Sequence, residues 1–298
     1  MAGRKLKMIY GILAFLLFAV LAGVTLWCES TGERLEELES PSQYDVVLPA
    51  DYNMVVFGDS ILGQIRDKTG IPYQVAEALG MKVYNAAMGG TCMGRQYERE
   101  NPGDIKDALS MVSLSKSVVS GDFRMQKLVE TDESGMGYFP HIIEQIRWID
   151  FSKVELLLIG YGTNDYHAGE QIYNEDNPYD EYTYTGALRS VVRTLQNAYP
   201  DMRIVLVTSP YTWYTNEGLT CEEYVLGGNV LKEYVDALLE TAEELGVEAI
   251  DLYHDAFPHD TWEDWQRYSV DGLHPNEDGR NLLSQIIIDY FEENPQEE

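Results

Sequence analysis

The sequence is short of basic residues and of cysteine, and each shortage excludes a class of protein. Among its 298 residues, 21 Lys and Arg stand against 50 Asp and Glu, which gives a net charge of −29. Because so acidic a surface repels phosphate backbones, charge-driven nucleic-acid binding is excluded. The three cysteines, Cys28, Cys92 and Cys221, are too few for a disulfide framework, and their positions leave the disulfide state of Cys92 and Cys221 open.

The remaining composition is that of a folded protein. Apolar residues make up 45% of the chain and charged residues 24%, which suffices for one large core or two modest ones. The 21 Tyr, 8 Phe and 5 Trp are too many for a disordered chain. We also find no internal repeat and no low-complexity tract.

An uncharged apolar run lies close to the N-terminus. Residues 8–27 carry no charge, and as a helix they would extend roughly 30 Å, the thickness of the hydrocarbon core of a bilayer. Arg4, Lys5 and Lys7 precede the run, whereas the rest of the chain has a charge of −32. By the positive-inside rule, we expect residues 1–28 to form a cytoplasmic tip and a transmembrane signal anchor, with the body exported.

Two other interpretations of this segment remain open. A cleaved signal peptide would use residues 20–22 as a passable site and release a secreted protein. A lipoprotein would be modified at Cys28, but the bulky Trp27 before it does not resemble the small residue that such sites carry. After the segment, residues 29–50 read as an acidic linker, and residues 51–298 form the main domain.

The main domain alternates short apolar runs with amphipathic stretches. The apolar runs predict strands at 53–57, 82–85, 154–159, 203–207 and 247–251, and the amphipathic stretches predict helices at 72–79, 185–198, 230–245 and 276–291. Strands separated by helices predict a parallel sheet covered on both faces, a three-layer α/β/α domain. In such sheets ligands bind at the carboxyl ends of the strands.

Four segments at or after strand ends carry residues that can do chemistry. Ser60 follows the first strand in Gly-Asp-Ser-Ile, where its hydroxyl meets the free N–H groups of a helix start. The paired glycines ending at Gly90 follow the second strand, and they allow a backbone N–H group to approach a ligand closely. Asn164 follows the third strand and offers a side-chain amide. Near the C-terminus, Asp271 and His274 are three residues apart, so that the carboxylate can reach the imidazole.

Each segment taken alone has an ordinary structural interpretation. A Gly-Asp-Ser segment is more often only a turn or a helix cap. A lone asparagine usually caps a helix or forms hydrogen bonds with the backbone of its loop. Asp271 and His274 can equally be a surface pair or two metal ligands. Together they supply a nucleophile, a base with its orienting acid, and donors for an oxyanion.

The four segments resemble the motif blocks of the GDSL/SGNH hydrolase superfamily of serine esterases and lipases. Gly-Asp-Ser-Ile is similar to the first block, with Ile61 in place of the usual Leu, and Gly90 resembles the glycine of the second. Gly-Thr-Asn-Asp around Asn164 resembles the third block, and Asp271-x-x-His274 resembles the last. The resemblance covers roughly residues 51–291.

The resemblance implies a fold and a set of roles. The fold is flavodoxin-like with a five-stranded parallel sheet, and the family uses neither a metal nor another cofactor. Ser60 is then the nucleophile, His274 the base and Asp271 the acid that orients it. The backbone N–H groups of Ser60 and Gly90 and the amide of Asn164 form the oxyanion hole.

The substrate is less clearly indicated. Three loops, 166–184, 211–224 and 253–268, hold 14 of the 34 aromatic residues, and these either stack on sugar rings or pack the loops onto the domain. We expect an extracytoplasmic O-acetyl esterase acting on a carbohydrate. The alternatives are a membrane-tethered O-acyltransferase of cell-surface glycans, a GDSL-type lipase and an inactive glycan-binding module. We expect the other histidines to be structural or on the surface: His141, His167, His254 and His259.

Overall fold

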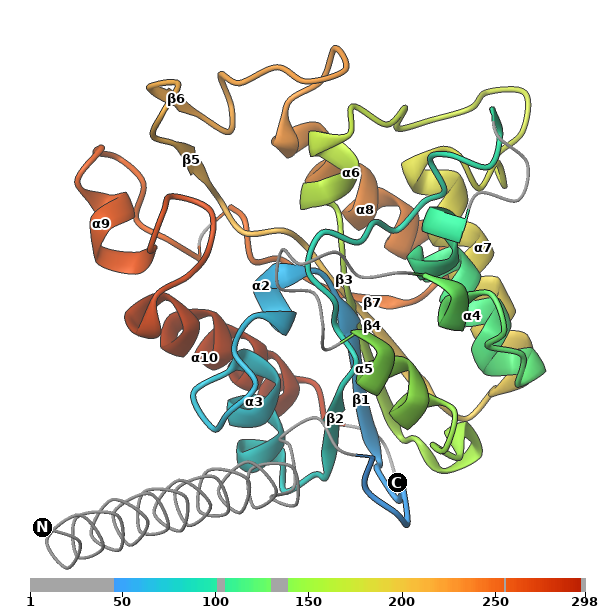
Figure 1. Ribbon diagram of the computed structural model, residues 1–298. Coiled ribbons are helices and arrows are strands. Elements are labelled where there is room, and N and C mark those ends of the chain that lie inside the picture. The colour runs from blue at the N-terminus through green and yellow to red at the C-terminus, as the bar shows by residue number, and fades with distance from the viewer. Residues whose placement is uncertain (1–45, 101–104, 130–138, 255, 296–298) are drawn as a thin grey trace, which may run out of the picture. The chain divides into compact units, whose positions relative to one another are not determined.

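The computed structural model describes residues 46–100, 105–129, 139–254 and 256–295, all within one compact unit, Val46–Glu298 (Figure 1). The expected membrane anchor and most of the expected acidic linker lie outside the described residues. Within the described ranges, no helix has both the length and the apolar character needed to cross a membrane. Cys92 and Cys221 are both free thiols.

Five parallel strands form the central sheet, as the sequence predicts. They are β1 (Met54–Gly58), β2 (Val83–Asn85), β3 (Leu156–Gly160), β4 (Arg203–Val207) and β7 (Glu248–Ile250), in the order β2-β1-β3-β4-β7. Each strand begins and ends within two residues of the predicted bounds. The fold is therefore the α/β arrangement that the alternating pattern indicates.

Helices cover both faces of this sheet (Figure 1). α3 (Ile71–Leu79) packs against α10 (Glu277–Glu293) on one face, and α4 (Met111–Ser120), α7 (Tyr184–Ala198) and α8 (Leu231–Leu245) pack in succession on the other. The described part of the chain also contains α5 (Phe139–Ile146), the short helices α2 (Ser60–Gly63), α6 (Thr163–His167) and α9 (Asp264–Tyr268), 3-10 turns at Ile105–Leu109, Gln126–Leu128 and Phe151–Lys153, and a hairpin of β5 (Trp213–Tyr214) and β6 (Leu219–Thr220).

The helix boundaries follow from local chemistry. Pro72 lies in the first turn of α3, where its missing N–H costs no hydrogen bond, and the helix ends at Gly80 with a φ of +66°. Asn276 caps α10 by accepting the N–H of Gly279 at 3.0 Å. α4 and α5 did not appear among the predicted helices, although both bury an apolar side.

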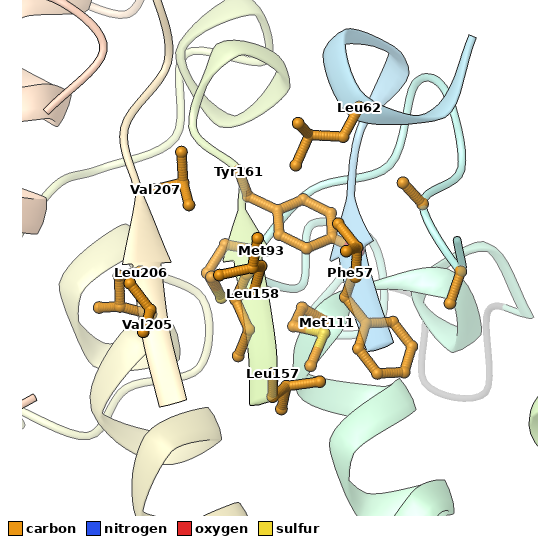
Figure 2. Close-up of a cluster of buried hydrophobic side chains, with 14 of the residues drawn as sticks. Phe57, Leu62, Met93, Met111, Leu157, Leu158, Tyr161, Val205, Leu206 and Val207 are labelled. Atoms are coloured by element: carbon orange, nitrogen blue, oxygen red, sulfur yellow. The ribbon is translucent and has the colours of Figure 1, made fainter. Parts of the chain in front are cut away.

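The core lies on both sides of the two central strands. Every residue of β1 and β3 is buried, and Figure 2 shows Phe57 and Leu157 among the packed side chains. Met111 of α4 and Met93 from the loop after β2 fill the space beside them. Truncating a buried leucine such as Leu157 to alanine costs about 2–5 kcal/mol, so this packing fixes the strand ends firmly.

The strand order creates a switch point between β1 and β3. After β1 the chain moves to β2 on one side, and all later strands add on the other side, so that the connections leaving the carboxyl ends of β1 and β3 run in opposite directions and leave a crevice typical of ligand sites in such sheets. Gly58 and Gly160 pair at these two ends, and a Cβ on Gly58 would lie 2.8 Å from the carbonyl oxygen of Gly160. Only glycines allow this approach, which brings the segments that follow β1 and β3 together.

Candidate active site

Ser60 is the first residue of α2, directly beyond β1. Asp59 caps this short helix, because its carboxyl oxygen accepts the N–H of Ile61 at 2.9 Å. The amide of Asn85, at the end of β2, donates to the carbonyl oxygen of Leu62 at 2.8 Å and fixes α2 to the sheet. The half-buried Ser60 hydroxyl is thus held on a rigid support at the crevice.

His274 links Ser60 to Asp271 although 214 residues separate the serine from the histidine. Nε2 of His274 lies 3.0 Å from Oγ of Ser60, and Nδ1 lies 2.7 Å from Oδ2 of Asp271. Oδ1 of Asp271 accepts the backbone N–H groups of Leu273 at 2.9 Å and of His274 at 2.7 Å. Burial raises the pKa of Asp271, but the hydrogen bonds from His274 and Leu273 outweigh it and hold that pKa below its usual value. Asp271 is therefore a carboxylate that can orient the imidazole.

The loop that carries Asp271 and His274 depends on one glycine. Gly272 has a φ of +95°, and its carbonyl oxygen accepts the N–H of Trp213 at 2.8 Å. A Cβ at this position would lie 2.1 Å from the carbonyl oxygen of Trp213. The β5–β6 hairpin therefore packs directly against the loop and fixes its conformation.

The two other predicted oxyanion donors lie on neighbouring segments. Gly90 adopts a φ of +75° in the turn after β2, and Met88 attaches that turn to β1 by donating its N–H to the carbonyl oxygen of Gly58 at 2.8 Å. Nδ2 of Asn164 donates to the carbonyl oxygen of Thr91 at 3.0 Å. Because an amide nitrogen carries two hydrogens, Asn164 retains a second N–H for a ligand. The structure thus brings Asn164 to the glycine turn.

Three carboxyl groups near these donors are buried, those of Asp59, Asp165 and Glu170. Asp165 accepts the N–H groups of Met93 at 3.1 Å and Gly94 at 3.0 Å, and therefore holds the segment after the glycine turn. Burial raises the pKa of Asp165, and burial together with the nearby Asp165 raises the pKa of Glu170. Burial also raises the pKa of Asp59 to about 7. In the sequence, Asp59 and Asp165 lie in the first and third motif blocks, whereas Glu170 lies in none of the four.

The sequence contains a second Asp-x-x-His segment with the same local geometry. Oδ1 of Asp251 accepts the N–H groups of Tyr253 at 2.8 Å and His254 at 3.2 Å, and Oδ2 lies 2.6 Å from Nδ1 of His254. Here, however, Nε2 of His254 lies 3.4 Å from a carboxylate oxygen of Asp236. His254 therefore lies between two carboxyl groups and has no serine partner among these contacts.

Half of the aromatic side chains in the three loops pack the loops onto the domain. Seven of the 14 aromatic side chains are buried, which favours packing over sugar stacking for them. Tyr173, Tyr179 and Trp262 are exposed. Of the histidines, His259 stacks on Tyr211 with ring centroids 4.0 Å apart.

A cavity of about 390 Å³ opens beside the glycine turn, with Gly90, Thr91 and Tyr97 in its wall. Ser60 is not among the residues that line this cavity. Within the residues that the structure describes, no group of three or more His, Cys, Asp or Glu side chains has the arrangement to hold a metal ion.

Comparison with known proteins identifies the family. Residues 56–282 match the model of the GDSL-like lipase/acylhydrolase family, and the chain belongs to this family of acyl-ester hydrolases. The match includes each of the four segments around the crevice.

Two curated relatives that match part of the chain are named as esterases. The chain is 28% identical over 133 residues to "Isoamyl acetate-hydrolyzing esterase 1 homolog" of Bos taurus and 29% identical to that of Mus musculus. Each match covers 42% of this chain and 51% of the relative, so the chain spans about half the length of the curated relatives it matches.

Two solved structures have the same fold. A protein from Lactobacillus plantarum has a TM-score of 0.60 at 17% identity, over 82% of this chain and 98% of that chain. A possible lipase from Chitinophaga pinensis has a TM-score of 0.52 at 17% identity, over 80% and 97% of the two chains. At this identity the likeness concerns the fold alone.

Proposed function

We propose that the chain is a serine esterase in which Ser60, His274 and Asp271 form the catalytic triad. The observation that carries this proposal is the continuous hydrogen-bonded path from Oγ of Ser60 through His274 to Asp271, at 3.0 and 2.7 Å. This arrangement joins a nucleophile, a base and the carboxylate that orients the base.

The reaction proceeds in two halves. Ser60 attacks the ester carbonyl carbon while His274 takes the hydroxyl proton, and the imidazolium is stabilised by Asp271. The N–H groups of Ser60 and Gly90 and the amide of Asn164 stabilise the oxyanion. His274 then gives its proton to the leaving alcohol, which leaves an acyl-enzyme. Water, deprotonated by His274, attacks this acyl group; collapse releases the acid and returns the proton to Ser60.

The proposed substrate is an O-acetyl ester on a carbohydrate, cleaved on the extracytoplasmic side of a membrane. The acetyl group is supported by the name of the curated relatives, which refers to an acetate ester. The location is supported by the uncharged run at residues 8–27 and the three bases before it. The acidic body suits solubility beside an anionic cell surface and disfavours strongly anionic substrates.

Ser60→Ala tests the catalytic proposal. The full-length chain, purified in detergent, should release acetate from p-nitrophenyl acetate and from acetylated xylan, and the variant should lose both activities while remaining folded. Turnover of either ester by the Ser60→Ala variant at the wild-type rate would overturn the proposal. Adding an oligosaccharide acceptor separates hydrolysis from acyl transfer, because a transferase would move the acetyl group to the acceptor.

The location has a separate test. Cells that express the full chain should retain it in the membrane fraction after alkaline carbonate extraction. Protease added outside cells whose cytoplasmic membrane is intact should digest the main domain. A mature protein whose N-terminal residue follows Ala22 would instead show cleavage of a signal peptide.

A further inference from the structure

One histidine outside the triad lies near enough to His274 for that residue to lower its pKa. His167 is the last residue of α6, three residues after Asn164, and residues at this spacing share one face of a helix. Nε2 of His167 lies 2.7 Å from the hydroxyl of Tyr214 in β5. Both side chains are half-buried, so each retains contact with solvent.

This pair bridges the two sides of the site. α6 supplies Asn164 on the oxyanion side, whereas the hairpin that carries Tyr214 packs on the loop of His274 through the bond between Trp213 and Gly272. Figure 1 shows α6 and β5 at the end of the molecule where α2 lies, beyond the sheet. The pair therefore links the helix of Asn164 to the hairpin that packs on the loop of His274, close enough to His274 for that residue to lower the pKa of His167.

The electrostatics of the pair suit a neutral role beside the base. Burial lowers the pKa of His167, and the neighbouring His274 lowers it further. A neutral His167 does not repel the imidazolium that forms on His274 during catalysis. It also keeps both a donor and an acceptor nitrogen, as a hydroxyl group requires.

The leaving oxygen of a bound ester must lie beside Nε2 of His274, because that nitrogen protonates it. The alcohol half of the ester therefore extends toward the side of the site on which His274 lies. We propose that His167 and Tyr214 bind a hydroxyl group of this alcohol, so that the site selects acetate esters of sugars and polyols over acetate esters of simple alcohols. This inference rests on the proposed esterase function and specifies its substrate.

A matched pair of esters tests the inference. Ethylene glycol monoacetate and propyl acetate differ only by a hydroxyl in place of a methyl group. The full-length wild-type chain should have a kcat/KM about tenfold higher for the glycol ester, the effect of roughly one neutral hydrogen bond. Tyr214→Phe, which keeps the ring contacts with Tyr166 and Tyr224, should reduce this ratio to about one by lowering kcat/KM for the glycol ester more than for propyl acetate.

Tyr290→Phe is the matched control. It also removes a hydroxyl from a half-buried tyrosine, one that lies 3.1 Å from Glu248 at the opposite end of the sheet. This variant should keep the wild-type ratio of the two kcat/KM values. His167→Phe should behave as Tyr214→Phe does, whereas His167→Gln, which keeps a donor and an acceptor, should restore part of the preference.

The outcomes separate the inference from the proposed function. Equal kcat/KM values for the two esters in the wild type, with Ser60-dependent turnover of both, would overturn the inference alone. A Tyr214→Phe variant that loses the same factor on both esters would do so too, since it would assign the pair a purely structural role. Absence of Ser60-dependent turnover of any ester would overturn the proposed function itself.

Discussion

The buried carboxyl of Asp59 makes stability depend on pH in a way that one substitution should remove. Burial is the main cause that raises its pKa from 3.8 to about 7, and the nearby Asp165 adds to it, against the hydrogen bond from the N–H of Ile61. Below about pH 4 the group is protonated in both the folded and the unfolded chain. As the pH rises toward 7, the unfolded chain releases this proton first, so the folded state loses stability.

The size of this effect follows from the pKa difference. A change from 3.8 to about 7 corresponds to about 4 kcal/mol of folding free energy, lost between roughly pH 4 and pH 8. Asp59→Asn removes the ionisation but keeps the cap, because an amide oxygen can still accept the N–H of Ile61. The free energy of unfolding of the variant, relative to the wild type, should therefore rise by about 4 kcal/mol over this range.

Urea unfolding of both proteins at several pH values measures this difference. Asp67→Asn is the matched control, because Asp67 also accepts the N–H of the second residue after it, at 2.8 Å, but is exposed. Hydrogen bonds from Thr69 hold the pKa of Asp67 below its usual value, so its contribution is lost as the pH falls, with the opposite sign. A stability difference between Asp59→Asn and the wild type that stays constant from pH 4 to pH 8 would refute the reasoning.

Three further variants test the geometry of the site. Asn164→Ala should lower kcat for p-nitrophenyl acetate by about 10²–10³ through loss of an oxyanion donor, and an unchanged kcat in steady-state kinetics would remove Asn164 from that role. His274→Ala should lower kcat by about 10⁴ or more, whereas His254→Ala, in the other Asp-x-x-His segment, should leave it unchanged; equal losses in the two variants would contradict the assignment. Gly272→Ala places a Cβ against the carbonyl oxygen of Trp213 at a positive φ, so chemical denaturation should show a loss of about 2 kcal/mol. The folded Gly272→Ala protein should also hydrolyse p-nitrophenyl acetate more slowly. Full activity would contradict the role of Gly272 in fixing the loop of Asp271 and His274.

The parallel sheet was predictable because its strands are short apolar runs with helical stretches between them. β1 and β3 are buried on both faces, and such strands read as continuous apolar sequence. α4 was harder to recognise, because Ser110, Ser113, Ser115 and Ser117 interrupt its apolar pattern. Ser110 nevertheless caps α4, and Ser115 lies buried with its hydroxyl on the carbonyl oxygen of Val112.

The sequence singled out Ser60, Asp271 and His274, and the structure places these residues in hydrogen-bond contact. Asp271-x-x-His274 and the segment ending at His254 have the same spacing and the same local hydrogen bonds, and spacing alone cannot distinguish them. What separates them is the third partner, Ser60 in one case and Asp236 in the other, which only the folded chain brings into place. The contact between His167 and Tyr214 is equally a product of tertiary structure, since the two residues are 47 positions apart in the sequence.

The acidic groups next to the proposed oxyanion donors bear on the proposed reaction. Asp59 directly precedes Ser60, and Asp165 directly follows Asn164, so each lies one residue from a group that faces the negative oxygen of the tetrahedral intermediate. An ionised carboxylate there would repel that oxygen, whereas a carboxyl that keeps its proton adds no opposing field. Burial raises the pKa of both groups and so favours the neutral form. In a chain with a formal charge of −29, burial of these two groups therefore reduces the negative charge next to the proposed oxyanion donors.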